Sequence, residues 1–405
     1  MIATARSLSR GGISYTAIGL SPSTVMGVSR YLRPHIAGVG PDARAEPEAY
    51  VDFLLGIVRE RGIRLVLPLT DRTLLTCVRF RDAIEAEARL AAPPSAAVHN
   101  VLDKTANLDL ARSVGVPCPA QFHLEHLEQI PGLIEEIGFP LVLKDPGVAT
   151  EGERPRLALD WVVVRDEREL ERRLTEYARQ GTFPIVQEYL PELGQRLYCF
   201  AARGEIVVAQ QTRMLRTLRG RAVYRETIPV TADLHRYTAS LLRALEWDGI
   251  AGLEFKVRAS DGDVRYIETN GRVWAALEGS VGAGWDFPVW VHDYFLHGRL
   301  PEPRPPGRGV GKRARWHFGD LQALVRFLEG HEQPGFDGRT RKGAIADYLA
   351  GFSPGVHPDV FRWDDPVPEL AEHARGARVG AYELLRKSSA LRRVIRFLRR
   401  RRGGR

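Results

Sequence analysis

Two acidic residues and an amide lie close together in the second half of the sequence. Glu254 belongs to the stretch GLEFKV, and Glu268 and Asn270 belong to RYIETN, so the two stretches predict the arms of a β-hairpin. Carboxylate and amide oxygens are ligands that Mg²⁺ prefers, with phosphate oxygens and water completing its shell. Arg272 follows and offers a fork of donors for a phosphate or carboxylate oxygen. The pattern indicates a site for a metal-bound triphosphate.

These three oxygen-bearing side chains share one face only in certain hairpin registers. Alternate residues of a strand point to the same face, so Glu268 and Asn270 already agree. Glu254 joins them when opposed residues have numbers with an even sum. Pairing Ser260 with Val264 meets this condition, leaves a three-residue loop and sets Glu254 opposite Asn270. The alternative is a half-buried hairpin whose charges only face water.

The elements that must position these residues are of mixed type. Residues 3–100 alternate helical and strand-like stretches and predict a small α/β layer. The stretches DKTANLDLARSV, FPLVLKD, LDWVVVRD and FPIVQEYL predict an α+β unit, and YCFAARG, EIVVAQQT and the hairpin predict a second one. The Pro- and Gly-rich PEPRPPGRGVGKR predicts a linker. The expected division is 1–100, 101–185, 186–300, a linker 301–313, a C-terminal region 314–385 and a tail 386–405.

Four segments of the chain, in this order, resemble motifs of the ATP-grasp superfamily. DKTANLDLARSVGVPCP and FPLVLKD are similar to the segments that carry two phosphate-binding lysines. PIVQEYLP resembles the interdomain strand that receives adenine, and YIETNGRVW resembles the metal-binding signature. The resemblance therefore implies that ATP is bound by Lys104, Lys144, Gln187, Glu188, Tyr189 and Leu190, and the metal by Glu254, Glu268 and Asn270.

This resemblance also implies a fold and a reaction. The fold class is mixed α/β and α+β, an ATP-grasp fold with an N-terminal Rossmann-like domain and a small C-terminal region. Such N-terminal domains begin with an apolar strand, whereas a helix-like segment starts here almost at Met1, so either the chain begins late or its start is misassigned. The implied reaction is an ADP-forming ligation in which a carboxylate becomes an acyl phosphate and then joins an amine. The expected cofactors are ATP and Mg²⁺, which Mn²⁺ could replace.

Two positions depart from the family pattern. The expected phosphate-covering loop, residues 147–152, contains fewer glycines than is usual. Gln195 stands where an acidic ribose-binding residue is often found. The segment after Arg272 is similar to carbamoyl-phosphate-synthetase-like and amino-acid-adding ligases, which leaves the substrate unassigned.

An arginine-rich segment, TRMLRTLRGRAVYRET, precedes the hairpin. Its density of positive charge indicates recognition of an acidic substrate, a carboxylate or the acyl phosphate itself, and a solvated basic loop is the alternative. We favour Arg213 because it closes a predicted strand, where a side chain can be aimed at a site. Arg213, Arg272 and Lys144 are thus the expected catalytic residues.

The charge of the chain is concentrated at its end. The formal net charge is +8, but residues 386–405 contain ten Lys or Arg and no acid, so residues 1–385 carry 8 − 10 = −2. Nucleic-acid binding is therefore disfavoured for the body of the chain. The tail has apolar residues at helical spacing, Leu391, Val394, Ile395 and Leu398, which favours an anionic membrane surface over RNA, an acidic partner or a plain solubilising role.

Three widely spaced cysteines and the lack of a long apolar run favour a cytoplasmic protein, bound peripherally to the inner face of the membrane where the tail acts. The expected partners are small-molecule carboxylate and amine substrates and a second copy of the chain in a homodimer. Two other functions stay open. One is a nucleotide-binding protein without catalysis that serves a cell-envelope pathway, and the other is an ATP-grasp phosphotransferase.

Overall fold

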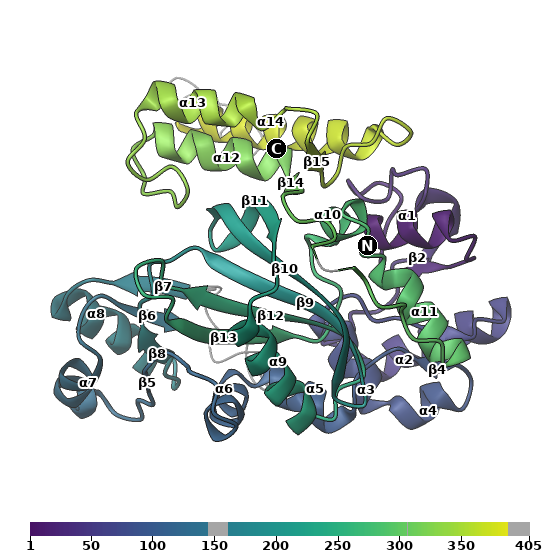
Figure 1. Cartoon of the computed structure of the whole chain (residues 1–405), viewed down its shortest axis with the longest axis horizontal. Helices are drawn as coiled ribbons and strands as arrows, with labels where there is room; N and C mark the ends of the chain where they lie inside the picture. The colour runs from purple at the N-terminus through teal and green to yellow at the C-terminus, as the bar shows by residue number, and fades with distance from the viewer. Residues whose placement is uncertain (145–160, 306, 388–405) are drawn as a thin grey trace, which may run out of the picture.

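The computed structural model describes residues 1–144, 161–305 and 307–387 (Figure 1). The expected phosphate-covering loop, 147–152, and the basic part of the tail, 388–405, lie outside these described residues. Nothing in the structure therefore tests the predictions made for them. Within the described residues, no helix combines the length and the apolar character needed to cross a membrane.

A mixed sheet dominates the structure. Seven described strands form it in the order β13-β12-β9-β10-β11-β14-β15. The first six are antiparallel neighbours, and β15 adds in parallel to β14. The strands are β9 (Gly194–Ala202), β10 (Glu205–Leu218), β11 (Arg221–Ile228), β12 (Gly249–Val257), β13 (Val264–Asn270), β14 (Arg313–Arg315) and β15 (Val356–Pro358).

The two faces of this sheet bury different cores. Leu197, Leu253 and Phe255 point to a core shared with α6 (Lys104–Ser113) and α9 (Ala232–Ala244). Tyr198 and Phe200 alternate to the other face. There they pack with residues of α10 (Leu277–Gly282) and α11 (Phe287–His297). We call the face of Leu197, Leu253 and Phe255 the helix-covered face. We call the opposite face the site face, because Glu254, which alternates with Leu253 and Phe255, lies on it.

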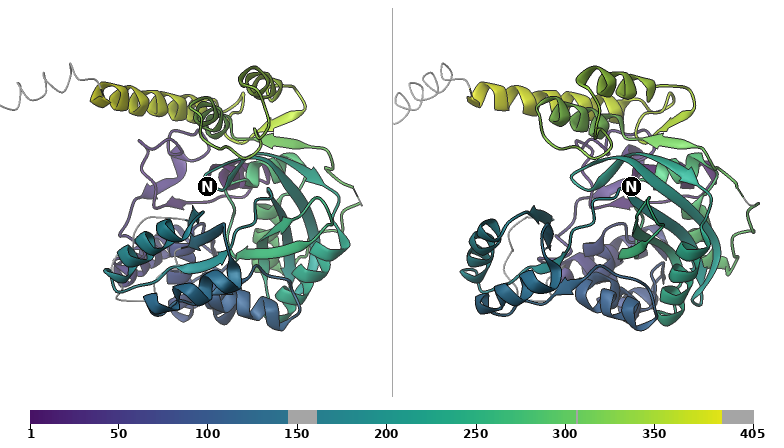
Figure 2. Two further views of the ribbon diagram at one scale, coloured as in Figure 1. Left: turned by 90° about the vertical axis from the view of Figure 1, so that its left-hand side faces the viewer. Right: turned by 60° about the vertical axis from the view of Figure 1, so that its left-hand side comes forward.

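A smaller sheet forms a separate lobe beside the main sheet (Figure 2). Its described strands run in the order β5-β8-β6-β7, all antiparallel. The helices α7 and α8 pack against it through a core of Leu, Ile and Val side chains. The elements are β5 (Gln121–Phe122), η2 (Leu127–Gln129), α7 (Ile130–Ile137), β6 (Leu141–Lys144), β7 (Trp161–Val164), α8 (Glu167–Ala178) and β8 (Ile185–Glu188).

The N-terminal part contains very short strands. β1 (Ala17–Ile18) pairs in parallel with β2 (Ile36–Gly38), and β3 (Leu65–Val66) pairs in parallel with β4 (Arg89–Leu90). The Rossmann-like sheet expected here is thus divided into two parallel pairs, and helices supply most of the core. The helices are α1 (Ile2–Arg10), η1 (Arg33–His35), α2 (Pro47–Arg61), α3 (Asp71–Arg79), α4 (Arg81–Glu85) and α5 (Ser95–Leu102).

The C-terminal region continues the main sheet. β14 begins at the end of the predicted linker and pairs with β11, so the region is attached through backbone hydrogen bonds. Three helices follow at one end of the molecule (Figure 1). They are α12 (His317–Leu328), α13 (Arg341–Ala350) and α14 (Val367–Lys387).

Candidate functional site

The hairpin β12–β13 has a different register from the predicted one. Glu254 lies opposite Glu268, and Gly252 lies opposite Asn270. The prediction of Glu254 opposite Asn270 is therefore wrong. The connecting loop has six residues, 258–263, because Val257 pairs with Val264, and it is held by a hydrogen bond from Arg258 N to Asp263 O of 2.8 Å.

A β-bulge restores the arrangement that the chemistry needs. The register shifts between Glu254 and Phe255, and without this shift the loop of even length would place the two glutamates on opposite faces. As a result, Glu254, Glu268 and Asn270 all lie on the site face. The predicted convergence of these side chains agrees with the observed strand pairing, although its geometric cause is different.

The hydrogen bonds of these residues leave oxygen atoms for a metal. Asn270 Nδ2 donates to Glu268 Oε1 at 3.1 Å, so the amide oxygen of Asn270 and Glu268 Oε2 are not used in this contact. Two carboxylates and one amide form a donor set of the kind that Mg²⁺ prefers. The described residues include no cluster of three or more His, Cys, Asp or Glu with metal-site geometry. Metal bound here would thus need further oxygens from phosphate or water.

Lys144 lies within electrostatic reach of this acidic pair. Burial lowers the pKa of Lys144 to about 8, Glu268 and Glu254 oppose this shift, and Lys104 adds to it. The four side chains come from two sheets and a helix, since Lys144 ends β6 in the small lobe and Lys104 begins α6. The structure therefore brings the two predicted lysines and the two glutamates to one place.

Helix α6 starts at Lys104 because of a local cap. The Asp103 side chain accepts hydrogen bonds from the backbone N–H groups of Thr105 and Ala106, at 2.9 and 3.0 Å. This cap satisfies two otherwise unpaired donors of the first turn. Lys104 is half-buried on that turn, and the cap fixes where its side chain leaves the helix.

The predicted adenine-binding residues lie at the end of β8. Gln187 is buried, and its amide donates to Gln121 Oε1 at 2.7 Å. The Glu188 carboxylate accepts from Ala120 N at 3.2 Å. Tyr189 and Leu190 follow the strand and are half-exposed. The side chain of Gln187 thus binds a neighbouring strand of the small sheet, β5.

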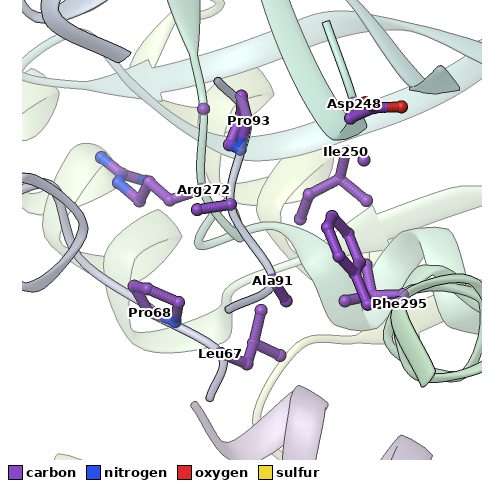
Figure 3. Close-up of a pocket in the computed structure, with 12 residues that line it drawn as sticks. Leu67, Pro68, Ala91, Pro93, Asp248, Ile250, Arg272 and Phe295 are labelled. Carbon is purple, nitrogen blue, oxygen red and sulfur yellow. The ribbon is translucent and has the colours of Figure 1, made fainter. Parts of the chain in front are cut away.

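Arg272 lies on the N-terminal side of the site. Its guanidinium forms a fork with the carboxylate of Asp71, with both bonds at 3.0 Å, and Asp71 is the first residue of α3. Figure 3 shows Arg272 at the edge of a small pocket, on the side opposite Phe295 and Asp248. The predicted catalytic arginine therefore joins the segment after β13 to the N-terminal part.

Arg213 is not brought to the site face. It lies opposite Gln195, and Arg196, the next residue of that strand, lies opposite Glu254. Because neighbouring residues alternate, Arg213 and Gln195 point to the helix-covered face. Arg213 is half-exposed there and pairs with Glu226 at 2.6 Å.

Two other arginines of the basic segment hold the C-terminal region. Arg216 binds Asp320 through two bonds of 2.6 and 2.7 Å, and Arg225 binds Asp359 in a second buried fork. The structure therefore gives these two residues a structural contact in place of the expected acidic substrate. In the sequence, the acidic partners lie 104 and 134 residues away, so no local pattern indicates the pairing.

Arg196 is a site residue that the sequence analysis missed. Its Nε and Nη2 donate to Glu254 Oε2 at 2.8 and 2.5 Å. Burial alone would lower the pKa of Arg196, but the ion pair with Glu254 raises it above its ordinary value. Strand alternation is the signal that could have indicated Arg196. Neighbouring residues of a strand point to opposite faces, and Arg196, not Gln195, shares a face with Glu254.

No family model matches the chain. Two curated relatives, the carbamoyl phosphate synthase large chains of two Thermus thermophilus strains, are 31% identical over 131 residues. The match covers 32% of this chain and only 12% of each relative. It therefore identifies a shared segment and not the whole relative.

Several solved structures are similar over most of the chain. The biotin carboxylase of Campylobacter jejuni has a TM-score of 0.60 at 15% identity, covering 77% of this chain and 71% of that one. The biotin carboxylase domain of Hydrogenobacter thermophilus 2-oxoglutarate carboxylase, with MgADP, ADP and bicarbonate, has a TM-score of 0.59 at 17% identity, covering 76% of this chain and 70% of that one.

A third similar structure is the ADP complex of an N5-carboxyaminoimidazole ribonucleotide synthetase, with a TM-score of 0.56 at 15% identity, covering 81% of this chain and 82% of that one. At these identities the likeness concerns the fold alone. The resemblance predicted from the four sequence motifs is confirmed at that level, and the chain has the ATP-grasp fold.

Proposed function

We propose that this protein is an ADP-forming ligase that phosphorylates a carboxylate and couples the resulting acyl phosphate to an amine. The observation that carries the proposal is the position of Lys144 within electrostatic reach of Glu268, Lys104 and Glu254. Two cations from one side and two carboxylates from the other are what a metal–triphosphate complex requires. The ATP-grasp fold and the nucleotide complexes of its structural neighbours support the same assignment.

In this proposal each side chain has a defined task. Lys104 and Lys144 bind the phosphates, and the end of β8 at Glu188 receives adenine. Glu254, Glu268 and Asn270 would hold Mg²⁺, which lowers the charge on the phosphates and makes the terminal phosphorus easier to attack. Catalysis then comes mainly from positioning and electrostatics, and a protein nucleophile is not required.

Arg272 has a less direct part in the proposal. Its fork with Asp71 fixes the guanidinium at the junction of the N-terminal part and the metal-binding strand. From there a change of partner would bring it to a carboxylate or phosphoryl oxygen. We assign Arg213 no task, because it lies on the other face.

The test is ADP release from ATP and Mg²⁺ with panels of acids and amines. The ligase requires that ADP release depend on both a carboxylate and an amine. Hydroxylamine should replace the amine and yield a hydroxamate, because it traps an acyl phosphate. A stable phosphorylated product would favour the phosphotransferase, and ATP binding without turnover would favour the non-catalytic protein.

The membrane role of the tail is a separate proposal that rests on the sequence alone. Cosedimentation of the full chain with vesicles containing an anionic lipid, compared with a chain that ends at Leu385, tests it. Equal binding of both chains would exclude the tail as the anchor.

A further inference from the structure

The site face contains a row of three charges on neighbouring strands. Arg196 on β9 lies opposite Glu254 on β12, which lies opposite Glu268 on β13. Like charges directly opposite each other destabilise a sheet, and the two glutamates are in that arrangement. The arginine supplies the positive charge that lowers this repulsion. Its position at the end of the row makes it a partner of one glutamate only.

The contact between Arg196 and Glu254 is one-sided. Both hydrogen bonds end on the same atom, Glu254 Oε2. The pair is largely shielded, with side-chain exposures of 20% for Arg196 and 13% for Glu254. Shielding from solvent strengthens the attraction between the two charges. A cation that approaches Glu254 must therefore compete with one already present.

A glycine stands beside the second oxygen. A Cβ atom added at Gly194 would lie 3.3 Å from Glu254 Oε1 and 2.8 Å from Met214 Cε. The absence of a side chain at Gly194 thus keeps space beside Oε1. The side-chain oxygen of Asn270 takes no part in the contact with Glu268, because it is the amide nitrogen that donates to Glu268.

We propose that Arg196 is a positioning residue whose positive charge neutralises Glu254 as long as no divalent cation is bound there. It thereby makes the binding of the cation depend on nucleotide. This inference rests on the proposed metal site. Without nucleotide, the arginine neutralises Glu254 and lowers the affinity for the cation. With nucleotide bound, the phosphates add oxygen ligands and negative charge, and the balance changes in favour of the metal.

The experiment measures Mn²⁺ binding to the full chain by calorimetry and by the electron paramagnetic resonance of free Mn²⁺, with and without ADP. Without ADP, Arg196→Gln is expected to bind Mn²⁺ about tenfold more tightly than the wild type, because one competing charge is removed. ADP should then increase the affinity of the variant less than that of the wild type. Arg196→Lys, which retains the charge but lacks the fork, should fall between the two.

The matched control is Arg243→Gln. Arg243 also donates two hydrogen bonds to one glutamate, Glu205, at 2.7 and 2.9 Å, but they end on its two different oxygens and the pair is exposed, at the end of α9 and the start of β10. The control should bind Mn²⁺ like the wild type. A purely structural role of Arg196 would lower the melting temperature without tightening metal binding.

Equal or weaker Mn²⁺ binding by Arg196→Gln would overturn the inference. If that variant does not fold, Arg196→Lys takes its place in the test. Mn²⁺ affinity of Arg196→Lys that is no higher than that of the wild type would then overturn the inference. Glu254→Gln separates this result from a failure of the site itself. Loss of Mn²⁺–ADP binding in Glu254→Gln keeps the site valid, whereas unchanged binding would remove the metal site and the proposed function with it.

Discussion

The hydroxyl group of Tyr266 joins the helix that begins at Lys104 to the strand that carries Glu268 and Asn270. It donates to Asn107 Oδ1 at 2.5 Å and lies 2.6 Å from Thr269 Oγ1. Asn107 is one turn along α6 from Lys104, and Tyr266 precedes Glu268 by two residues on β13. Tyr266 is fully buried, so the contact is shielded from water. The helix that begins at Lys104 is therefore fixed to the strand of Glu268.

Replacing Tyr266 with Phe should separate these two elements. We expect a loss of about 1–3 kcal/mol in the free energy of unfolding, because Asn107 and Thr269 are left with unpaired buried groups. ADP affinity should also fall as Lys104 loses its fixed position. Urea unfolding and calorimetry measure the two effects. Tyr237→Phe on α9 is the control, and a Tyr266→Phe variant as stable as this control would contradict the argument.

The binding of MgADP should weaken as the pH rises from 7 to 9. Burial lowers the pKa of Lys144 to about 8, so the side chain loses its charge in this range. Bound phosphate favours the charged form, and binding near pH 8 should take up a proton. Calorimetry in buffers of different ionisation enthalpy measures this uptake. Lys144→Arg stays charged and should bind with little pH dependence, and a wild type with a flat profile would exclude the assignment.

The same shift affects the ligand-free protein in the opposite direction. The pKa of Lys144 is lower in the fold than its ordinary value of 10.5, so the unfolded chain binds more protons between pH 8 and 10.5. The Lys144 contribution to the free energy of unfolding should therefore increase through this range. Comparison of the wild type with Lys144→Gln in urea at pH 7.5 and 9.5 tests the sign.

Glu268→Gln should abolish ATP turnover without unfolding the protein. The glutamine amide keeps the shape of the Glu268 side chain and its contact with Asn270, but it removes the negative charge that a divalent cation needs. We expect turnover to fall by at least about a thousandfold, by analogy with the loss of key electrostatic groups in other active sites. ADP release and the melting temperature are the measurements. A variant that retains turnover would show that the metal is bound elsewhere.

Asp320→Ala should destabilise the attachment of the C-terminal region. The Asp320 carboxylate is fully buried and accepts from Arg216 and from Arg315, at 2.5–2.7 Å. Its removal leaves two buried guanidinium groups without their counter-ion, with a cost of about 3–5 kcal/mol.

Denaturant unfolding measures this loss. The control is Asp233→Ala, which breaks the exposed pair with Arg236 and should leave the transition where it is. If both variants unfold at the same denaturant concentration, Asp320 does not hold the region in place.

Periodicity and motif order determined much of this protein without coordinates. The strands around Lys144, Glu188, Glu254 and Glu268 form where apolar alternation and turn residues indicate them. Such signals are local, because the side-chain periods of helices and strands depend on neighbouring residues only. The same local order of motifs was enough to predict the ATP-grasp fold.

Contacts between distant residues were decided by the tertiary structure. The bulge after Glu254 sets the hairpin register, and a two-residue period cannot reveal where a strand gains one residue. The partners of Arg196, Arg216 and Arg225 lie 58, 104 and 134 positions away. Each arginine has the same local signal, whether its partner is a glutamate on the next strand or a buried aspartate of the C-terminal region. The pairing of β9 with β12 decides the partner of Arg196, and the packing of the sheet against the C-terminal region decides those of Arg216 and Arg225.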